Sequence, residues 1–299
     1  MARRPRRRRR SRVAGALLAV VAFVVALGVA AAVVVTALDR LQPDAPLVAR
    51  CAATLDDTDW TLSPDQAQHA ALFAAMAERR HLPARAVTIA IATGMQESKL
   101  ENIDYGDRDS IGLFQQRPSQ GWGTVEEIMD PVYSTGKFYD GLVKVKGYED
   151  LEVTVAAQAV QRSGFPDAYA QHETRARAWA SALTGHSPET LTCTLPEPAE
   201  PGSPDAAVAR LERDFGGLAH EQVPATDDEP ASLVVHTGTL GDTPERQAWA
   251  VAAWAVATAQ VLGTTSVDVA DRTWARDSAE WTSTDAPLAT GDVRLTFAP

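Results

Sequence analysis

The longest feature of the hydrophobic pattern is an apolar run near the start of the chain. Residues 13–38 form 26 consecutive positions without a charged side chain, and a helix needs only about 20 apolar residues to cross a bilayer. A cleavable signal peptide has a shorter apolar core of about 7–15 residues. The pattern therefore predicts a transmembrane signal-anchor. The alternative is an over-long signal peptide that is cut near the three alanines at positions 30–32.

Basic residues before this run indicate its orientation. Eight arginines lie within residues 1–12, and the first acidic residue of the chain is Asp39. Because positively charged flanks stay in the cytoplasm, residues 1–12 are expected to form a cytoplasmic tail. The bulk of the chain after residue 38 is then extracytoplasmic, and residues 39–50 are expected to be a short linker.

Helical start signals dominate the next part of the sequence. Ser63 and Gln66 have the spacing of a capping box that opens a helix to about Arg80. Pro83 precedes a segment that is apolar on nearly every face, which predicts a buried helix. Three further starts are expected at Thr124 with Glu127, at Asp130 with Pro131 and at Pro166, and a stop is expected at Gly185. No long stretch alternates with period two, so residues 51–193 are predicted to form a mainly α domain.

A change of composition separates this part from the end of the chain. Residues 186–205 contain five prolines and little apolar periodicity, which predicts a linker. Residues 206–299 then show strand patterns at 231–238, 266–271 and 292–299 and a helical pattern at 244–263. The expected fold is a mainly α domain, preceded by one transmembrane helix and followed by a small α/β domain. In the latter, His236, Trp249 and Trp254 are interpreted as structural residues.

Charge and cysteine content narrow the function classes. The chain has 28 Lys and Arg against 39 Asp and Glu, so removing the eight arginines leaves 20 against 39, a balance of −19. Such a surface repels nucleic acid and anionic lipid. The two cysteines, Cys51 and Cys193, bracket the mainly α domain. In an exported chain they are expected to form a disulfide, and two buried thiols are the alternative.

The stretch GMQESKLENIDYGDRDSIGLFQQRPSQGWG, residues 94–123, holds the candidate chemistry. Glu97 stands at the end of the predicted buried helix, where apolar walls and the negative pole of the helix dipole both favour the protonated carboxyl. A protonated glutamate is a general acid, and glycosidic bond cleavage needs one with a raised pKa. The alternative is an exposed glutamate at a frayed helix end.

The motifs of this stretch resemble those of lytic transglycosylases and goose-type lysozymes over about residues 62–185. The resemblance is carried by Glu97-Ser98 and by Gly112-Leu113-Phe114-Gln115, which is similar to the GLMQ motif of these families. It implies a lysozyme-like fold for residues 51–193, Glu97 as the catalytic acid, and a sugar-binding floor to which Ser98, Gly112 and Phe114 belong. In such a floor Gly112 lets the backbone approach a sugar, while Gln115 and Gln116 offer amide donors and acceptors.

Other positions of these families match in part. Gly106-Asp107-Arg108 resembles goose-type lysozymes at a carboxylate that helps to orient water, which implies a catalytic role for Asp107. The chain has Gln116-Arg117 where goose-type enzymes carry a further Asp. It has Ala159-Val160-Gln161 where transglycosylases carry AYN, so Gln161 keeps the amide and Tyr169 is the nearest ring. Gln161 and Tyr169 are therefore candidate substrate-binding residues, and the reaction outcome stays open between hydrolysis and transglycosylation.

Metal and cofactor sites are not expected. Asp104, Asp107 and Asp109 lack the order of an EF-hand loop, and His172-Glu173 has no second His at zinc spacing. Trp122 either stacks on a sugar or closes a core edge.

Three function classes can be compared at this point. The first is a membrane-anchored enzyme that cuts the β-1,4 bond of peptidoglycan glycan strands, with Glu97 as acid and then base. The second is an inactive binding or scaffold protein of the cell envelope. The third, a transporter or channel, has little support because one span cannot line a pathway by itself. The sequence does not indicate an oligomeric state.

Overall fold

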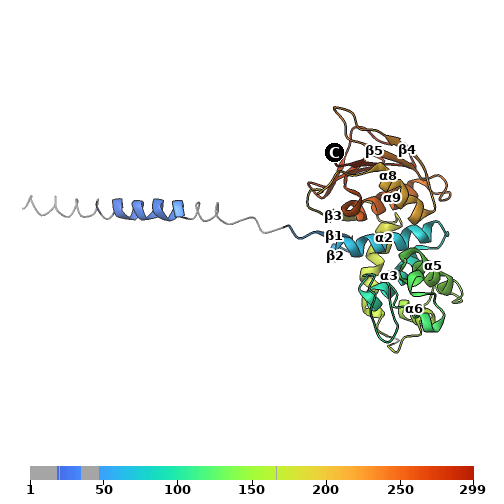
Figure 1. Cartoon of the computed structure of the whole chain (residues 1–299). Coiled ribbons are helices and arrows are strands. Elements are labelled where there is room, and N and C mark those ends of the chain that lie inside the picture. Colours follow the sequence, from blue (N-terminus) through green and yellow to red (C-terminus); the bar gives the residue numbers. More distant parts are fainter. Residues whose placement is uncertain (1–18, 20, 35–46, 166) are drawn as a thin grey trace, which may run out of the picture. The chain divides into compact units, whose positions relative to one another are not determined.

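The computed structural model describes residues 19, 21–34, 47–165 and 167–299 (Figure 1). The chain divides into two compact units, residues 1–47 and residues 48–299. In the first unit the described residues 21–34 are helical and exposed. None of the helices in the described ranges combines the length and the apolar character needed to cross a membrane.

The transmembrane part of the expected fold is therefore corrected. Of the predicted span 13–38, residues 13–18, 20 and 35–38 lie outside the described residues, as do the tail 1–12 and positions 39–46 of the linker.

The second unit begins with a β-hairpin and continues into helices. The hairpin consists of β1 (Arg50–Leu55) and β2 (Thr58–Leu62). The helical elements that follow are α2 (Pro64–Glu78), α3 (Ala84–Ser98), η1 (Pro118–Gln120), α4 (Val125–Met129), α5 (Pro131–Leu142), α6 (Val153–Gln161), η2 (Ala170–His172) and α7 (Glu173–Leu183). They pack around α3, which contacts α2, α5, α6 and α7.

The predicted helix starts are confirmed at four of five positions. At the start of α2 the Ser63 hydroxyl accepts a hydrogen bond from the Gln66 N–H at 3.2 Å, and the Gln66 side chain accepts one from the Ser63 N–H at 2.9 Å. Thr124 forms the same kind of capping box for α4, and Asp130 caps α5. Pro83 directly precedes α3. The fifth start is wrong, because α7 begins at Glu173; Pro166 itself lies outside the described residues.

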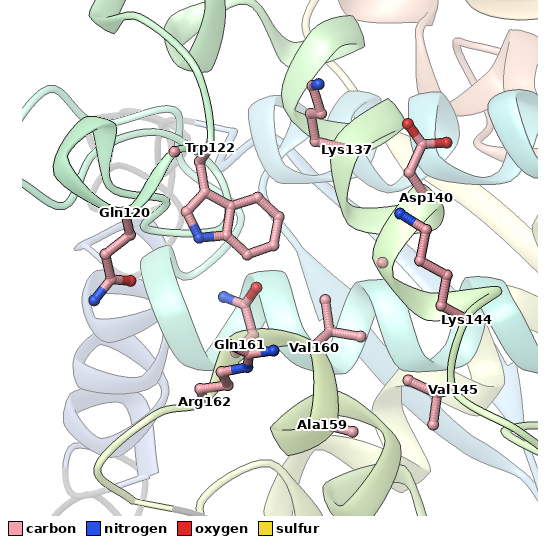
Figure 2. A pocket seen from close by; sticks show the side chains of 12 residues that line it. Gln120, Trp122, Lys137, Asp140, Lys144, Val145, Ala159, Val160, Gln161 and Arg162 are labelled. Carbon is pink, nitrogen blue, oxygen red and sulfur yellow. The ribbon is translucent and has the colours of Figure 1, made fainter.

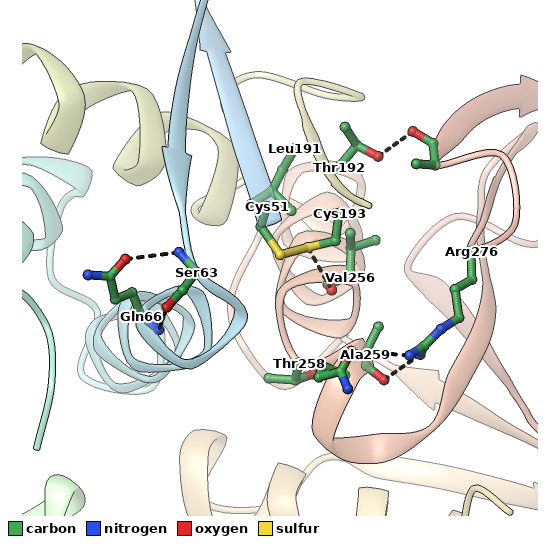
Figure 3. Close-up of a disulfide and its surroundings, with 12 residues drawn as sticks. Cys51, Ser63, Gln66, Leu191, Thr192, Cys193, Val256, Thr258, Ala259 and Arg276 are labelled. Carbon is green, nitrogen blue, oxygen red and sulfur yellow. Dashed lines mark hydrogen bonds between the residues drawn. A yellow bond between two sulfur atoms is a disulfide. The ribbon is translucent and has the colours of Figure 1, made fainter. Parts of the chain in front are cut away.

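A three-stranded antiparallel sheet of order β2-β1-β3 contradicts the expectation of a mainly α domain. Its third strand, β3 (Leu191–Thr194), comes from the segment that was expected to be a linker. Cys51 of β1 and Cys193 of β3 are direct partners in the strand register and form a disulfide, as predicted (Figure 3). Both sulfur-bearing side chains are buried. These strands have four to six residues and are rich in Ala and Thr, so they leave only a short alternating pattern.

The C-terminal part contains a six-stranded sheet and three helices. The strands are β4 (Ala219–Val223), β5 (Ser232–His236), β6 (Thr264–Val269), β7 (Arg272–Ala275), β8 (Glu280–Ser283) and β9 (Asp292–Phe297). The helices are α8 (Pro204–Phe215), α9 (Pro244–Ala257) and α10 (Ala259–Leu262). All pairings in the order β4-β5-β9-β6-β7-β8 are antiparallel.

This sheet also corrects the predicted fold class. Of the described residues, 44% are helical and 18% lie in strands, and these strands form two antiparallel sheets. The predicted pattern of one mainly α domain followed by a small α/β domain therefore does not describe the chain. The patterns at β5, α9, β6 and β9 were interpreted correctly, whereas α8, β4, β7 and β8 were missed. The three missed strands have only one or two apolar residues each.

Helix α9 joins the helical part to the C-terminal sheet. It contacts α2 and α7 as well as β3, β6 and β9, which explains why most of its residues are buried. At its start, Arg246 forms a bidentate ion pair with the nearly buried Glu78 of α2, at 2.7 and 3.0 Å. Gly185 lies against this turn at a φ of +72°, and a Cβ there would come within 2.0 Å of the Arg246 carbonyl oxygen. The two parts consequently share one packed interior.

Candidate functional site

Glu97 lies in the last turn of α3, and the local sequence explains why the helix ends just after it. Lys99 and Leu100 adopt positive φ angles of 58° and 62°. The Leu100 N–H donates to the Gly94 carbonyl at 3.0 Å. This turn is tight, because a Cβ on Gly94 would lie 2.7 Å from the Leu100 side chain. The chain thus folds back under the helix and leaves Glu97 at the margin of the packed interior.

The Glu97 carboxyl is held by a buried tyrosine. The Tyr169 hydroxyl donates a hydrogen bond to Glu97 Oε1 at 2.6 Å, and the Tyr169 side chain is fully buried. Burial raises the pKa of the Glu97 carboxyl, while the polar contacts with Tyr169 and Gln161 act in the opposite direction. Burial and the neighbouring Glu97 charge raise the pKa of Tyr169. The carboxyl therefore retains its proton at a higher pH than an exposed glutamate does.

Glu97 opens onto a cavity of about 450 Å³. Asp107 supplies the second carboxylate of the lining. Four glutamine side chains also line it, from Gln115, Gln116, Gln120 and Gln161. Aromatic rings come from Trp122 and from Phe165, which is 77% exposed. A proton donor, amides and ring faces thus surround one space.

Two of the glutamines present acceptors without a partner. The Gln116 side chain is 1% exposed and its amide N–H donates to the Ser134 carbonyl. The Gln161 amide N–H donates to the Phe114 carbonyl at 2.7 Å. Within the described residues, Gln116 Oε1 and Gln161 Oε1 are buried without a hydrogen bond. Buried polar atoms are normally paired, and neither of these two oxygens is exposed to the cavity.

Gln115 closes another side of the cavity. It has a positive φ of 47°, and its amide N–H groups lie 3.3 Å from the carbonyls of Tyr105 and Gly112. A Cβ on Gly106 would come within 1.9 Å of the Gln115 Oε1 atom. Glycine at position 106 therefore allows this side chain to fold against the loop.

Three predicted floor residues do not line the cavity in the described part of the chain. The Ser98 hydroxyl is buried and lies 2.8 Å from the Leu113 carbonyl, to which it donates. Phe114 is fully buried and stacks between Phe73 and Phe138, with ring centroids 4.9 and 4.5 Å away. Gly112 has a φ of +77°, and a Cβ there would meet the Ile128 carbonyl at 2.9 Å. These residues support the loop that carries the glutamines.

The aspartates of the loop occupy different environments. Asp107 has a side chain that is 90% exposed, and its only ion-pair neighbour within the described residues is Arg108 at 3.9 Å. Asp109 is bound by Arg117 at 2.6 Å and by the Ser119 N–H at 2.8 Å. Hydrogen bonds from Ser119 and Arg117 hold the pKa of Asp109 well below its usual range.

No cluster that suits a metal ion is formed by the described residues. Of the pair considered as zinc ligands, His172 contacts the Gln96 side chain at 3.1 Å, and Glu173 forms an ion pair with Arg85 at 3.0 Å.

A second hollow of about 820 Å³ adjoins the cavity (Figure 2). The two share Gln120, Trp122, Gln161 and Arg162 as lining residues. Trp122 lines the two hollows and also packs against the core, which agrees with the interpretation that it closes a core edge; stacking on a sugar stays a prediction.

Several lining residues were missed by sequence reasoning. Arg162, Phe165, Lys137 and Lys144 belong to the two hollows but to none of the motifs. The available signals were an aromatic residue in a polar loop at Phe165 and three of the four lysines within residues 137–146.

Comparison with models of protein families gives no match for this chain, and comparison with curated proteins gives no significant match. The contacts around Glu97 therefore provide the basis for assigning a function.

Proposed function

We propose that the chain cleaves the β-1,4 glycosidic bond of peptidoglycan glycan strands, with Glu97 as the general acid and then the general base. One observation carries this proposal: the Glu97 carboxyl has a raised pKa, is fixed by Tyr169, and faces a cavity lined with amides and rings. A general acid for glycoside cleavage needs this combination of protonation, fixed position and access to substrate. The resemblance of Glu97-Ser98 and Gly112–Gln115 to the transglycosylase and goose-type lysozyme motifs supports the same reaction.

The chemistry requires two proton transfers at Glu97, one from the carboxyl and one back to the carboxylate. Glu97 gives its proton to the glycosidic oxygen, the bond from the anomeric carbon to that oxygen breaks, and the leaving sugar departs as an alcohol. The resulting Glu97 carboxylate then takes a proton from the attacking hydroxyl, which belongs to water or to the sugar's own C6 position. The Tyr169 hydrogen bond stabilises the carboxylate between these two steps.

The lining suits an amino sugar with N-acetyl groups. The half-buried Gln115 and the exposed Gln120 offer amide groups to acetamido and hydroxyl groups of a sugar. Trp122 and Phe165 offer flat apolar faces. The disulfide between Cys51 and Cys193 supports an oxidising, extracytoplasmic compartment, where peptidoglycan is found.

The decisive experiment incubates the purified full chain with peptidoglycan and identifies the released fragments by mass. Anhydro ends indicate transglycosylation, and reducing ends indicate hydrolysis. Glu97→Gln keeps the shape of the side chain but removes the proton, so the rate of cleavage is expected to fall by about 10²–10⁴-fold while glycan binding persists. Equal cleavage by parent and variant would contradict the role of Glu97.

Two further variants sharpen this test. Glu101→Gln is the matched control, because Glu101 is exposed, follows α3 closely and does not line the cavity in the described part of the chain. Its cleavage rate is expected to equal that of the parent. Asp107→Asn distinguishes hydrolysis from transglycosylation. A large loss of cleavage activity favours hydrolysis with a positioned water, and near-normal activity favours a reaction that uses Glu97 as its one carboxylate. Glycan binding without any fragments from the parent indicates an inactive binding protein instead.

A further inference from the structure

The second hollow extends the candidate cleft away from Glu97. Its walls are formed by α5, by the loop after α5, and by the end of α6. Figure 2 shows Trp122 and Gln120 on one side of it and Lys137, Asp140 and Lys144 on the other. Because Trp122 and Gln161 line both hollows, a ligand at Glu97 can continue directly into this space.

Basic side chains line the second hollow, although the chain as a whole is acidic. Lys137, Lys144 and Arg162 line it, although the part of the chain after residue 38 has 20 basic residues against 39 acidic ones. Lys144 and Arg162 are exposed. None of the three forms an ion pair with a described residue. Their charges therefore remain available to a ligand.

The one carboxylate among the described lining residues, Asp140, is paired with a cation that lies outside the hollow. Asp140 forms an ion pair at 2.6 Å with Arg80, which does not line the hollow in the described part of the chain. Lys137 lies over the ring of Tyr133, with its ammonium 5.1 Å from the ring centroid. This contact fixes the lysine without consuming its charge. The hollow consequently presents a net positive surface of three cations.

We propose that this hollow binds the carboxylate-bearing branch of the glycan strand while Glu97 acts on the adjoining sugar. The inference rests on the proposed function and names the part of the substrate that the second hollow recognises. The branch is either a peptide with free carboxylates or the lactyl carboxylate that remains when the peptide is removed. Cations that lack an internal partner gain a charge-assisted hydrogen bond from such a group.

Binding is measured with the full chain carrying Glu97→Gln, so that no substrate is cut. Three soluble probes of equal sugar length are compared: peptide-bearing glycan, glycan stripped of its peptides, and a chitin oligosaccharide without carboxylates. Lys137→Gln with Lys144→Gln is expected to weaken binding of a carboxylate-bearing probe by about 10-fold at low salt and to leave chitin binding unchanged. Raised salt should remove most of this difference.

Matched variants separate charge from folding. Lys146 is exposed in the loop after α5 and does not line the second hollow in the described part of the chain. The variant Lys146→Gln should therefore bind all three probes as tightly as the chain without this change. Lys137→Arg with Lys144→Arg keeps both charges and should retain the affinity. Loss with peptide-bearing glycan alone identifies the peptide as the branch, and loss with stripped glycan alone identifies the lactyl carboxylate. An equal loss with both probes shows that the hollow binds either carboxylate.

Two results would overturn the proposal, and they differ from each other. In the first, the chain with Glu97→Gln alone binds all three probes, and adding Lys137→Gln with Lys144→Gln leaves each affinity unchanged. The second hollow then does not recognise the carboxylate, and the proposed function stands. If the parent binds none of the probes, the proposed function fails and this inference fails with it.

Discussion

Loss of the disulfide is expected to destabilise the second unit strongly. The bond joins Cys51 and Cys193, which are 142 residues apart, so the loop that it closes contains all helices from α2 to α7. For a loop of this length the chain-entropy model gives about 5 kcal/mol of stabilisation near room temperature. In a unit of this size each kcal/mol shifts the midpoint of thermal unfolding by about 2–4 °C, so the expected fall is about 10–20 °C.

The assay follows thermal unfolding of the full chain by circular dichroism, with and without a thiol reductant. The chain has two cysteines, so any effect of reductant on thiols reports this bond alone. Cys51→Ala with Cys193→Ala is the control, because it should unfold at the same temperature in both conditions. Its midpoint is expected to lie slightly below that of the reduced parent, since both sulfur atoms are buried and alanine leaves their space partly empty.

Equal midpoints for the oxidised and the reduced parent would refute this reasoning. They would mean that the loop is already constrained in the unfolded chain, or that the sheet β2-β1-β3 does not limit unfolding. A fall of similar size in the double alanine variant on adding reductant would show that the reductant acts elsewhere.

Three other predictions concern titration and burial. Glu97→Gln should raise the free energy of unfolding at neutral pH. Burial raises the pKa of Glu97 in the folded chain above its ordinary value of 4.5. The protonated carboxyl therefore contributes fully to stability below pH 4.5, and this contribution is lost as the pH rises through the folded pKa. Denaturant titrations of parent and variant at a series of pH values should therefore converge in acid, and a constant difference at all pH values would contradict this sign. Tyr169→Phe removes a hydrogen bond that lowers the pKa of Glu97, so the alkaline limb of the pH profile of kcat/KM for peptidoglycan cleavage should move to higher pH; an unchanged limb would show that another group limits the rate. Asp214→Ala should cost about 3–5 kcal/mol in denaturant unfolding, because this fully buried carboxylate bridges Arg210, Arg213 and the Trp254 indole N–H and its loss leaves buried charge unpaired, whereas a cost below about 1 kcal/mol would contradict that role.

Local sequence signals were enough to predict the starts of most helices in the second unit. Capping boxes at Ser63 and Thr124 and prolines at first helical positions mark helix starts through contacts within four residues. Such contacts can be recognised from the spacing of a few neighbouring residues in the sequence. The raised pKa of Glu97 was also predictable, because the apolar faces of α3 already imply burial of its last turn.

The sheets could not be predicted in the same way. Strand β3 pairs with β1, which lies more than 130 residues earlier, and neither segment shows a long alternating pattern. Pairing over such a separation depends on the whole fold. The prolines around β3 indicated a linker, although they stand outside the four residues that pair.

The candidate site shows the same division between local and distant contacts. Motif residues such as Gln115 and Gln116 were found because they lie in one loop. The role of Phe114, a loop residue, in the stacked core depends on Phe73 of α2 and Phe138 of α5. Lys137, Lys144 and Arg162 belong to α5, its following loop and the residue after α6, so only the folded chain brings them to one hollow.

The ion pair between Glu78 and Arg246 has a consequence for how this sequence can evolve. The two residues are 168 positions apart, and Arg246 also donates to the Thr184 carbonyl at 2.7 Å. Replacing either partner alone leaves the other charge uncompensated in a largely dry interface. In related sequences the two positions should therefore change together. Recombination that exchanges the C-terminal sheet for a foreign one should be tolerated only when helix α2 is inherited from the same parent.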